Sequence, residues 1–128
     1  MHKGIEIRRA HFPGRAPIDA YGNGGFRFAD MSHRGSLLCL PSGIFGWDAS
    51  SDTVLDELLF EKVFKEASDI DVLLVGTGLE IRLLPKPLKA RLRALSITSD
   101  AMNTGAAVRT YNVMLAESRA VAAALIAV

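Results

Sequence analysis

The second half of the chain alternates between helical and strand-like hydrophobic patterns, and this alternation limits the possible folds most. Residues 70–75 are continuously apolar except for Asp71, which is typical of a strand buried on both faces. Apolar residues at helical spacing precede this run, namely Leu55, Leu58, Leu59, Val63 and Phe64. Helical patterns at 85–95 and 104–117 then alternate with strand patterns at 96–102 and 120–128. Parallel strands need such crossover helices, so the order predicts a largely parallel, helix-covered sheet.

The predicted elements begin with recognisable end signals. Asp52 or Thr53 is a candidate N-cap for the first helix. Pro85 and Pro87 stand where the second helix begins, a place where proline loses no hydrogen bond. Between the predicted strand at 70–75 and the helix at 85–95, residues 79–84 are expected to add a short strand.

The first third of the chain predicts antiparallel strands. Segments 18–21 and 25–28 flank Asn23-Gly24, a strong hairpin signal, and a third strand is expected at 36–40 after a turn at 33–35. Segment 44–47 is apolar but compatible with either state. We therefore predict an antiparallel N-terminal meander followed by alternating helices and strands, in a layered α/β domain with a mixed β-sheet.

The chain length fits one domain. We expect residues 17–128 to form it, and residues 1–16, which lack periodicity and carry four Lys or Arg residues, to be a mobile basic arm. The longest apolar run, at 120–128, is far shorter than the roughly 18 residues that span a membrane. We expect a cytoplasmic protein, with peripheral membrane association left open.

Charge is balanced in total but uneven along the chain. Fifteen Lys and Arg oppose 14 Asp and Glu, which argues against a nucleic-acid partner. Residues 48–71 are mainly acidic, whereas residues 82–93 hold five basic residues and no acid: Arg82, Lys86, Lys89, Arg91 and Arg93. These five are a candidate docking surface for a partner protein or anionic headgroups, unless both stretches are simply solvated helix faces.

Two loops follow predicted parallel strands, where α/β sheets gather their ligands. One is Gly76-Thr77-Gly78, and the other leads into the helix that starts near Thr104. A helix start favours anions, so these loops predict a pocket for a carboxylate or phosphate. Its candidate residues are Gly76, Thr77, Gly78, Asp100, Asn103, Thr104 and Arg109. The same residues could instead form a tight turn, a helix cap at Thr104 and a structural bond from Arg109.

No catalytic, cofactor or metal motif is found in the sequence. Neither glycine cluster has the spacing of a nucleotide-binding loop. His2, His11 and His33 are scattered, and Cys39 is the only cysteine and lies in an apolar run. We predict no cofactor and no catalytic residue. Because catalytic groups meet in space and not in sequence, an enzyme is disfavoured but not excluded.

The carboxyl third carries the most specific motif. Residues 103–113, 117–119 and 120–125 resemble the closing signature of a family of small domains of unknown function, which includes the mitochondrial complex I assembly factor three and the adipogenesis-associated domain-containing protein. Segments 41–47 and 73–78 resemble earlier parts of the same family, so the resemblance covers roughly residues 16–127.

The resemblance implies a three-layer α/β fold with a mixed sheet and no assigned catalytic residue. It also implies an accessory or assembly role in which a partner protein, such as a subunit of a respiratory membrane complex, is bound. This chain has Asn103 where the family usually has aspartate, which puts an acid–base role there in doubt. One alternative is that the protein binds a small anionic metabolite or is an unassigned enzyme. Another is that it forms a homo-oligomer through the last strand or the Trp47 region.

Overall fold

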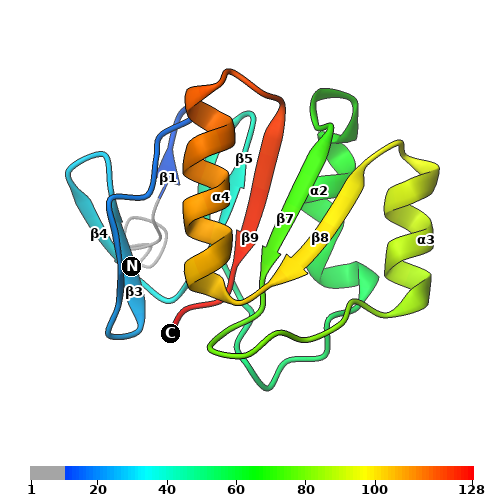
Figure 1. The fold of residues 1–128 in the computed structure, drawn as a ribbon, viewed down its shortest axis with the longest axis horizontal. Helices are drawn as coiled ribbons and strands as arrows, with labels where there is room; N and C mark the ends of the chain where they lie inside the picture. Colours follow the sequence, from blue (N-terminus) through cyan, green and yellow to red (C-terminus); the bar gives the residue numbers. More distant parts are fainter. Residues whose placement is uncertain (1–10) are drawn as a thin grey trace, which may run out of the picture.

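A six-stranded mixed sheet forms the middle layer of the domain (Figure 1). The computed structural model describes residues 11–128, and its main sheet has the order β1-β6-β5-β9-β7-β8. The strands are β1 (His11–Phe12), β5 (Ser36–Leu40), β6 (Gly43–Trp47), β7 (Val72–Gly76), β8 (Thr98–Met102) and β9 (Val121–Leu125). Strands β7, β8 and β9 are parallel, whereas β5 runs antiparallel to β9. The predicted mixed sheet is therefore confirmed.

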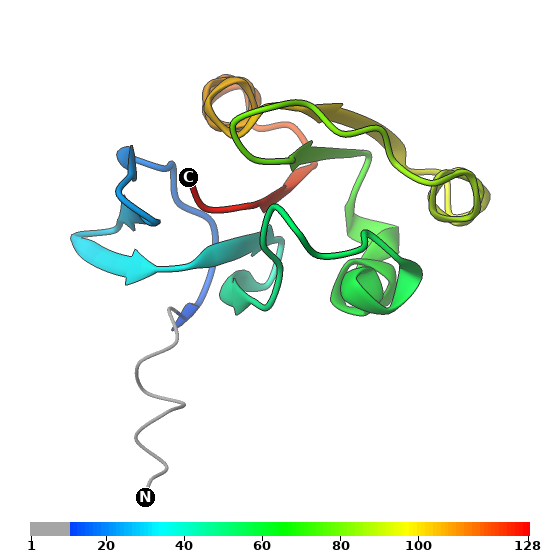
Figure 2. The ribbon, with the colours of Figure 1, turned by 90° about the horizontal axis from the view of Figure 1, so that it is seen from below.

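Layers cover both faces of this sheet (Figure 2). On one face lie α2 (Glu61–Lys65), its flanking 3₁₀ turns η1 (Glu57–Phe60) and η2 (Ala67–Asp69), and α3 (Lys86–Ala94). On the other lie α4 (Thr104–Ala116) and a second, three-stranded sheet. Side chains alternate between the two cores, since Leu73 and Val75 pack in one and Leu74 in the other. This arrangement gives the predicted three layers.

The second sheet consists of β2 (Ala20–Gly22), β3 (Gly25–Phe28) and β4 (Met31–Arg34). Asn23 and Gly24 have φ values of 52° and 79°, as the predicted two-residue hairpin turn requires. Ala29 and Asp30 repeat this geometry, with φ values of 48° and 62°. Alanine gives no turn signal, so β4 was not predicted, and the expected meander is divided between the two sheets.

Two predicted elements differ from the structure. The first helix begins late, because the Asp56 carboxylate caps η1 by accepting from the Leu59 amide at 3.2 Å, and Leu58 is 72% exposed. Residues 79–84 belong to no strand. Their backbone runs from the end of β7 to α3 without meeting a sheet edge, although their alternating pattern is typical of a strand.

The domain begins earlier than residue 17. The expected arm lies outside the described residues at 1–10, but residues 11–16 belong to the domain. His11 and Phe12 pair with Phe45 and Ile44 of β6, and Ala16 is buried, with its carbonyl accepting from the Tyr111 hydroxyl at 3.3 Å. For these six residues, the expectation of a mobile arm is wrong.

The surfaces suggested for self-association are largely internal. Strand β9 lies between β5 and β7, and all five of its residues are buried. Trp47 is buried against Phe60, and its indole Nε1–H donates to the Leu59 carbonyl at 2.9 Å. The last strand therefore cannot serve as the interface. Within residues 11–128, no helix has the length and apolar character needed to cross a membrane.

Candidate functional site

The loop after β7 and the start of α4 lie against each other. The Thr104 amide donates to the Gly78 carbonyl at 2.8 Å, and the Gly78 amide donates to the Thr104 hydroxyl at 3.0 Å. A Cβ added at Gly76 would come within 2.9 Å of Thr104 Cα, so only glycine allows this approach. The structure thus brings together Gly76, Thr77, Gly78 and Thr104.

The polar groups of this junction bond to one another. The buried Thr104 hydroxyl donates to the Ile126 carbonyl at 2.7 Å. The Thr77 hydroxyl, also buried, donates to the Glu80 carbonyl and accepts from the Arg82 amide, both at 2.9 Å. Asn103, and not Thr104, caps α4 by accepting from the Ala106 amide at 2.8 Å. These bonds fit the tight turn that the sequence also allowed.

The other two candidate pocket residues lie elsewhere. Asp100 is exposed on the edge strand β8, and Arg109 is exposed on α4. Within residues 11–128, neither side chain has a hydrogen bond or ion pair to the Gly76–Gly78 loop.

A cavity of about 470 Å³ adjoins this loop, and Arg82 lines it together with Thr77, Gly78 and Ser51. The Arg82 Nη2 donates to the Thr53 carbonyl at 2.6 Å. Its Nη1 is buried and has no hydrogen-bond partner among the residues that the structure describes. Buried polar atoms are nearly always paired, so this guanidinium nitrogen is a marked exception.

Three large apolar side chains surround Arg82 in sequence. Leu79, Ile81 and Leu83 are 82%, 59% and 85% exposed. We call residues 79–83 the exposed segment. The sequence analysis expected a short strand at residues 79–84, so the exposure of this segment was not predicted. Clustered exposed aliphatic groups are typical of interaction sites.

The predicted basic surface is divided in the structure. Arg91 pairs with Glu57 at 3.1 Å and lies 4.4 Å over the Phe64 ring, so it is held by the acidic stretch. Arg82 is turned toward Thr53. Lys86, Lys89 and Arg93 remain exposed on α3.

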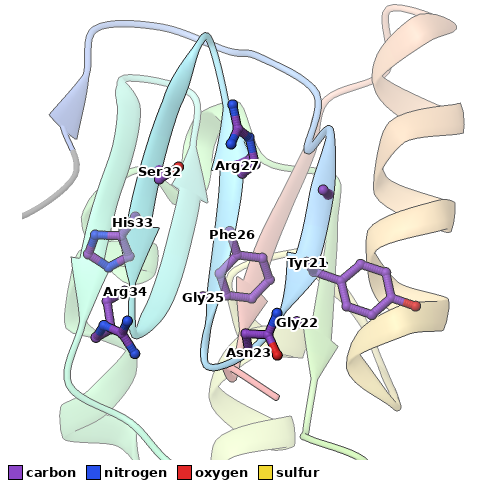
Figure 3. A pocket seen from close by; sticks show the side chains of 10 residues that line it. Tyr21, Gly22, Asn23, Gly25, Phe26, Arg27, Ser32, His33 and Arg34 are labelled. Carbon is purple, nitrogen blue, oxygen red and sulfur yellow. The ribbon is translucent and has the colours of Figure 1, made fainter.

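A second pocket, of about 390 Å³, lies on the three-stranded sheet (Figure 3). Tyr21, Asn23, Arg27, Ser32 and Arg34 line it, together with His33 and several small residues. No sequence motif marked this pocket. The sequence feature that could have indicated it is Arg27, which stands between the apolar residues Phe26 and Phe28 and therefore faces the opposite side of the strand.

The only cysteine is not a nucleophile. Burial raises the pKa of the Cys39 thiol to about 12, so the thiol stays protonated at neutral pH. Burial likewise raises the pKa of Tyr111, its neighbour. Among residues 11–128, no three His, Cys, Asp or Glu side chains are grouped so that they could hold a metal ion.

These features define a three-layer α/β domain that carries the exposed segment, the cavity beside Arg82 and the pocket on the three-stranded sheet. Residues 18–126 match the family described as Protein of unknown function (DUF498/DUF598), and the chain belongs to that family. The resemblance found in the sequence motifs is thereby confirmed.

Related proteins include both uncharacterised and named members. An uncharacterised protein of Rhodobacter capsulatus is 40% identical, with 93% of this chain and 90% of its own length covered. NADH dehydrogenase (ubiquinone) 1 alpha subcomplex assembly factor 3 of Mus musculus is 30% identical, with 95% of this chain and 66% of its own length covered. A solved structure of an outer membrane protein from Bartonella henselae has a TM-score of 0.88 and 60% identity, over 91% of this chain and 98% of its own.

Proposed function

We propose that this protein is a non-enzymatic accessory protein that binds a partner protein through the exposed segment during biogenesis of a membrane complex. The observation that carries this proposal is the exposure of Leu79, Ile81 and Leu83. They flank Arg82 in the sequence, and the buried Nη1 of Arg82 has no hydrogen-bond partner within residues 11–128. Burial of such side chains contributes about 1.5–3 kcal/mol each, so this segment offers substantial binding energy.

The partner's chemistry follows from this segment. Its apolar side chains match an apolar surface on the partner. Arg82 Nη1 lacks a hydrogen-bond acceptor within residues 11–128, and a carboxylate is the strongest acceptor for a guanidinium group. Lys86 and Lys89, at the start of the adjoining α3, add positive charge beside this surface.

The relationship to the mouse assembly factor supports a role beside a membrane complex. In this proposal the protein is cytoplasmic and reaches the membrane peripherally, through its partner.

The test is affinity purification of the full chain from solubilised native membranes. The double variant Leu79→Ser with Leu83→Ser should reduce recovery of the bound subunit more than tenfold, because it removes two leucines that the partner would bury in the complex. Val113, 58% exposed on α4, supplies the matched control Val113→Ser, which should leave recovery unchanged. Equal recovery with all three proteins would contradict the proposal.

A second candidate function is the binding of a small anionic ligand in the cavity beside Arg82. Arg82 Nη1, which has no hydrogen-bond partner in the described part of the chain, favours it, and Thr77 and Gly78 of the predicted pocket line the same cavity. A carboxylate at 100 times its dissociation constant should stabilise the protein by about 2.7 kcal/mol in a thermal-shift screen. Arg82→Gln should abolish that shift and Arg109→Ala should preserve it; no shift with any anion would exclude this function.

A further inference from the structure

The outer face of the three-stranded sheet is defined by its strand register. Phe26 and Phe28 are buried in the core, so Gly25 and Arg27 face away from it. Arg27 pairs with Ser32 on one side and Ala20 on the other, whereas Gly25 pairs with Arg34 and Gly22. Directly paired residues share a face, so Arg27 and Arg34 project from the same outer side of adjacent strands.

Small residues leave a hollow between these two arginines. The floor positions on this face are Ala20, Gly22 and Gly25, none of which has a side chain longer than a methyl group. The pocket of about 390 Å³ forms there, with Arg27 toward one end and Arg34 toward the other (Figure 3). Ser32 and Asn23 also line it and add polar groups that can donate hydrogen bonds.

The described residues that line the hollow carry only positive charge. Ten residues line it, and none of them is acidic. Both arginines are exposed, and within residues 11–128 neither has an ion pair with a carboxylate. Arg27 and Arg34 are diagonal neighbours on adjacent strands, close enough for long side chains to reach a common ligand between them.

We propose that this hollow binds a phosphate group carried by a small phosphate ester or by a lipid headgroup. Two cations and no acid favour a doubly charged anion over a single carboxylate, and the paired N–H groups of arginine match phosphate oxygens. The pocket is larger than the anion alone requires, which leaves room for the group that the phosphate is attached to. This site shares no lining residue with the cavity beside Arg82, so it does not rest on the proposed docking function.

The experiment has two arms on the full chain. In the first, glycerol 3-phosphate is titrated and the backbone amide shifts of residues 20–34 are followed by NMR. In the second, sedimentation with vesicles that contain phosphatidic acid is compared with sedimentation with phosphatidylcholine vesicles. Binding in the first arm alone assigns a soluble phosphate ester, and binding in the second alone assigns a lipid headgroup. Binding in both arms assigns the phosphate itself as the recognised group.

Variants connect either result to the hollow. The double variant Arg27→Gln with Arg34→Gln should weaken binding at least tenfold, and both positions are exposed, so the fold should be retained. Arg109→Gln removes an equally exposed arginine from α4 and should change affinity less than twofold. No binding in either arm would overturn the proposal, and so would binding that the double variant retains or that Arg109→Gln weakens equally.

Discussion

At the residue scale, one hydroxyl joins three parts of the chain. Thr104 lies at the start of α4, accepts from Gly78 after β7 and donates to Ile126 after β9. Its bonds close the edge of the sheet where a ligand pocket was predicted. Thr104, a candidate pocket residue in the sequence analysis, therefore links the loop after β7 to the residues that follow β9.

Removal of this hydroxyl should destabilise the fold. Thr104→Val keeps the shape of the side chain but leaves the Ile126 carbonyl without its donor, at a cost of about 1–3 kcal/mol in the free energy of unfolding. Urea unfolding measures the difference. Thr104→Ser, which retains the hydroxyl, should lose clearly less; equal losses in the two variants would show that the methyl group matters and the hydrogen bonds do not.

Buried Cys39 should make stability fall at alkaline pH. Its pKa is raised from an ordinary 9.0 to about 12, so the folded protein keeps a proton that the unfolded chain releases. This contribution is complete below pH 9 and is lost as the pH rises toward 12, at about 1.36 kcal/mol per pH unit. Tyr111, also raised, acts in the same direction at somewhat higher pH.

Urea unfolding at pH 7, 9 and 10 tests this expectation. The wild type should lose stability between pH 9 and 10, and Cys39→Ala should show a shallower loss over that interval. Identical slopes for the two proteins would mean that the thiol does not contribute.

At the element scale, Asn103 caps the start of α4, at the position where the sequence resemblance led us to expect aspartate. Asn103 accepts from Ala106, a bond that aspartate can form equally well. Asn103→Ala should lower the free energy of unfolding by about 1 kcal/mol. Asn103→Asp should raise the free energy of unfolding by up to about 1 kcal/mol, because a negative charge at the helix start interacts favourably with the helix dipole. Thermal unfolding distinguishes these outcomes; a destabilised aspartate variant would contradict the capping account.

The elements that sequence analysis predicted well carry strong local signals. The Asn23-Gly24 hairpin, the buried strand β7 and the helix α4 are each specified by residues within the element. The elements that differ depend on distant partners. Residues 79–84 have the alternation of a strand, but no sheet edge reaches them, and the first helix is shortened by the cap at Asp56.

The candidate site was also predictable only in part, because most of its contacts join residues that are distant in the sequence. Strand order placed the Gly76–Gly78 loop beside Thr104, as parallel strands require. The pairing of their polar groups, the unpaired Nη1 of Arg82 and the hollow between Arg27 and Arg34 depend on three-dimensional contacts that no spacing in the sequence encodes.

At the scale of the whole molecule, β9 joins the two halves of the chain in one sheet. It pairs with β5 from the N-terminal half and with β7 from the C-terminal half, and its side chains enter the two cores alternately from opposite faces of the sheet. Because the last strand is enclosed, surfaces for partners are left to the outer layers and the loops. The exposed segment, the basic side chains of α3 and the hollow of the small sheet are three such surfaces.

If the proposed function is right, a partner protein covers the exposed segment in the cell. A photocrosslinking residue placed at Leu83, with the same residue at Val113 as control, tests it in intact cells, because both side chains are exposed and neither supports the core. We expect a single crosslinked product from position 83, identified by mass spectrometry as a membrane-complex subunit, and none from position 113. Absence of a product at position 83, or the same products at both positions, would contradict it.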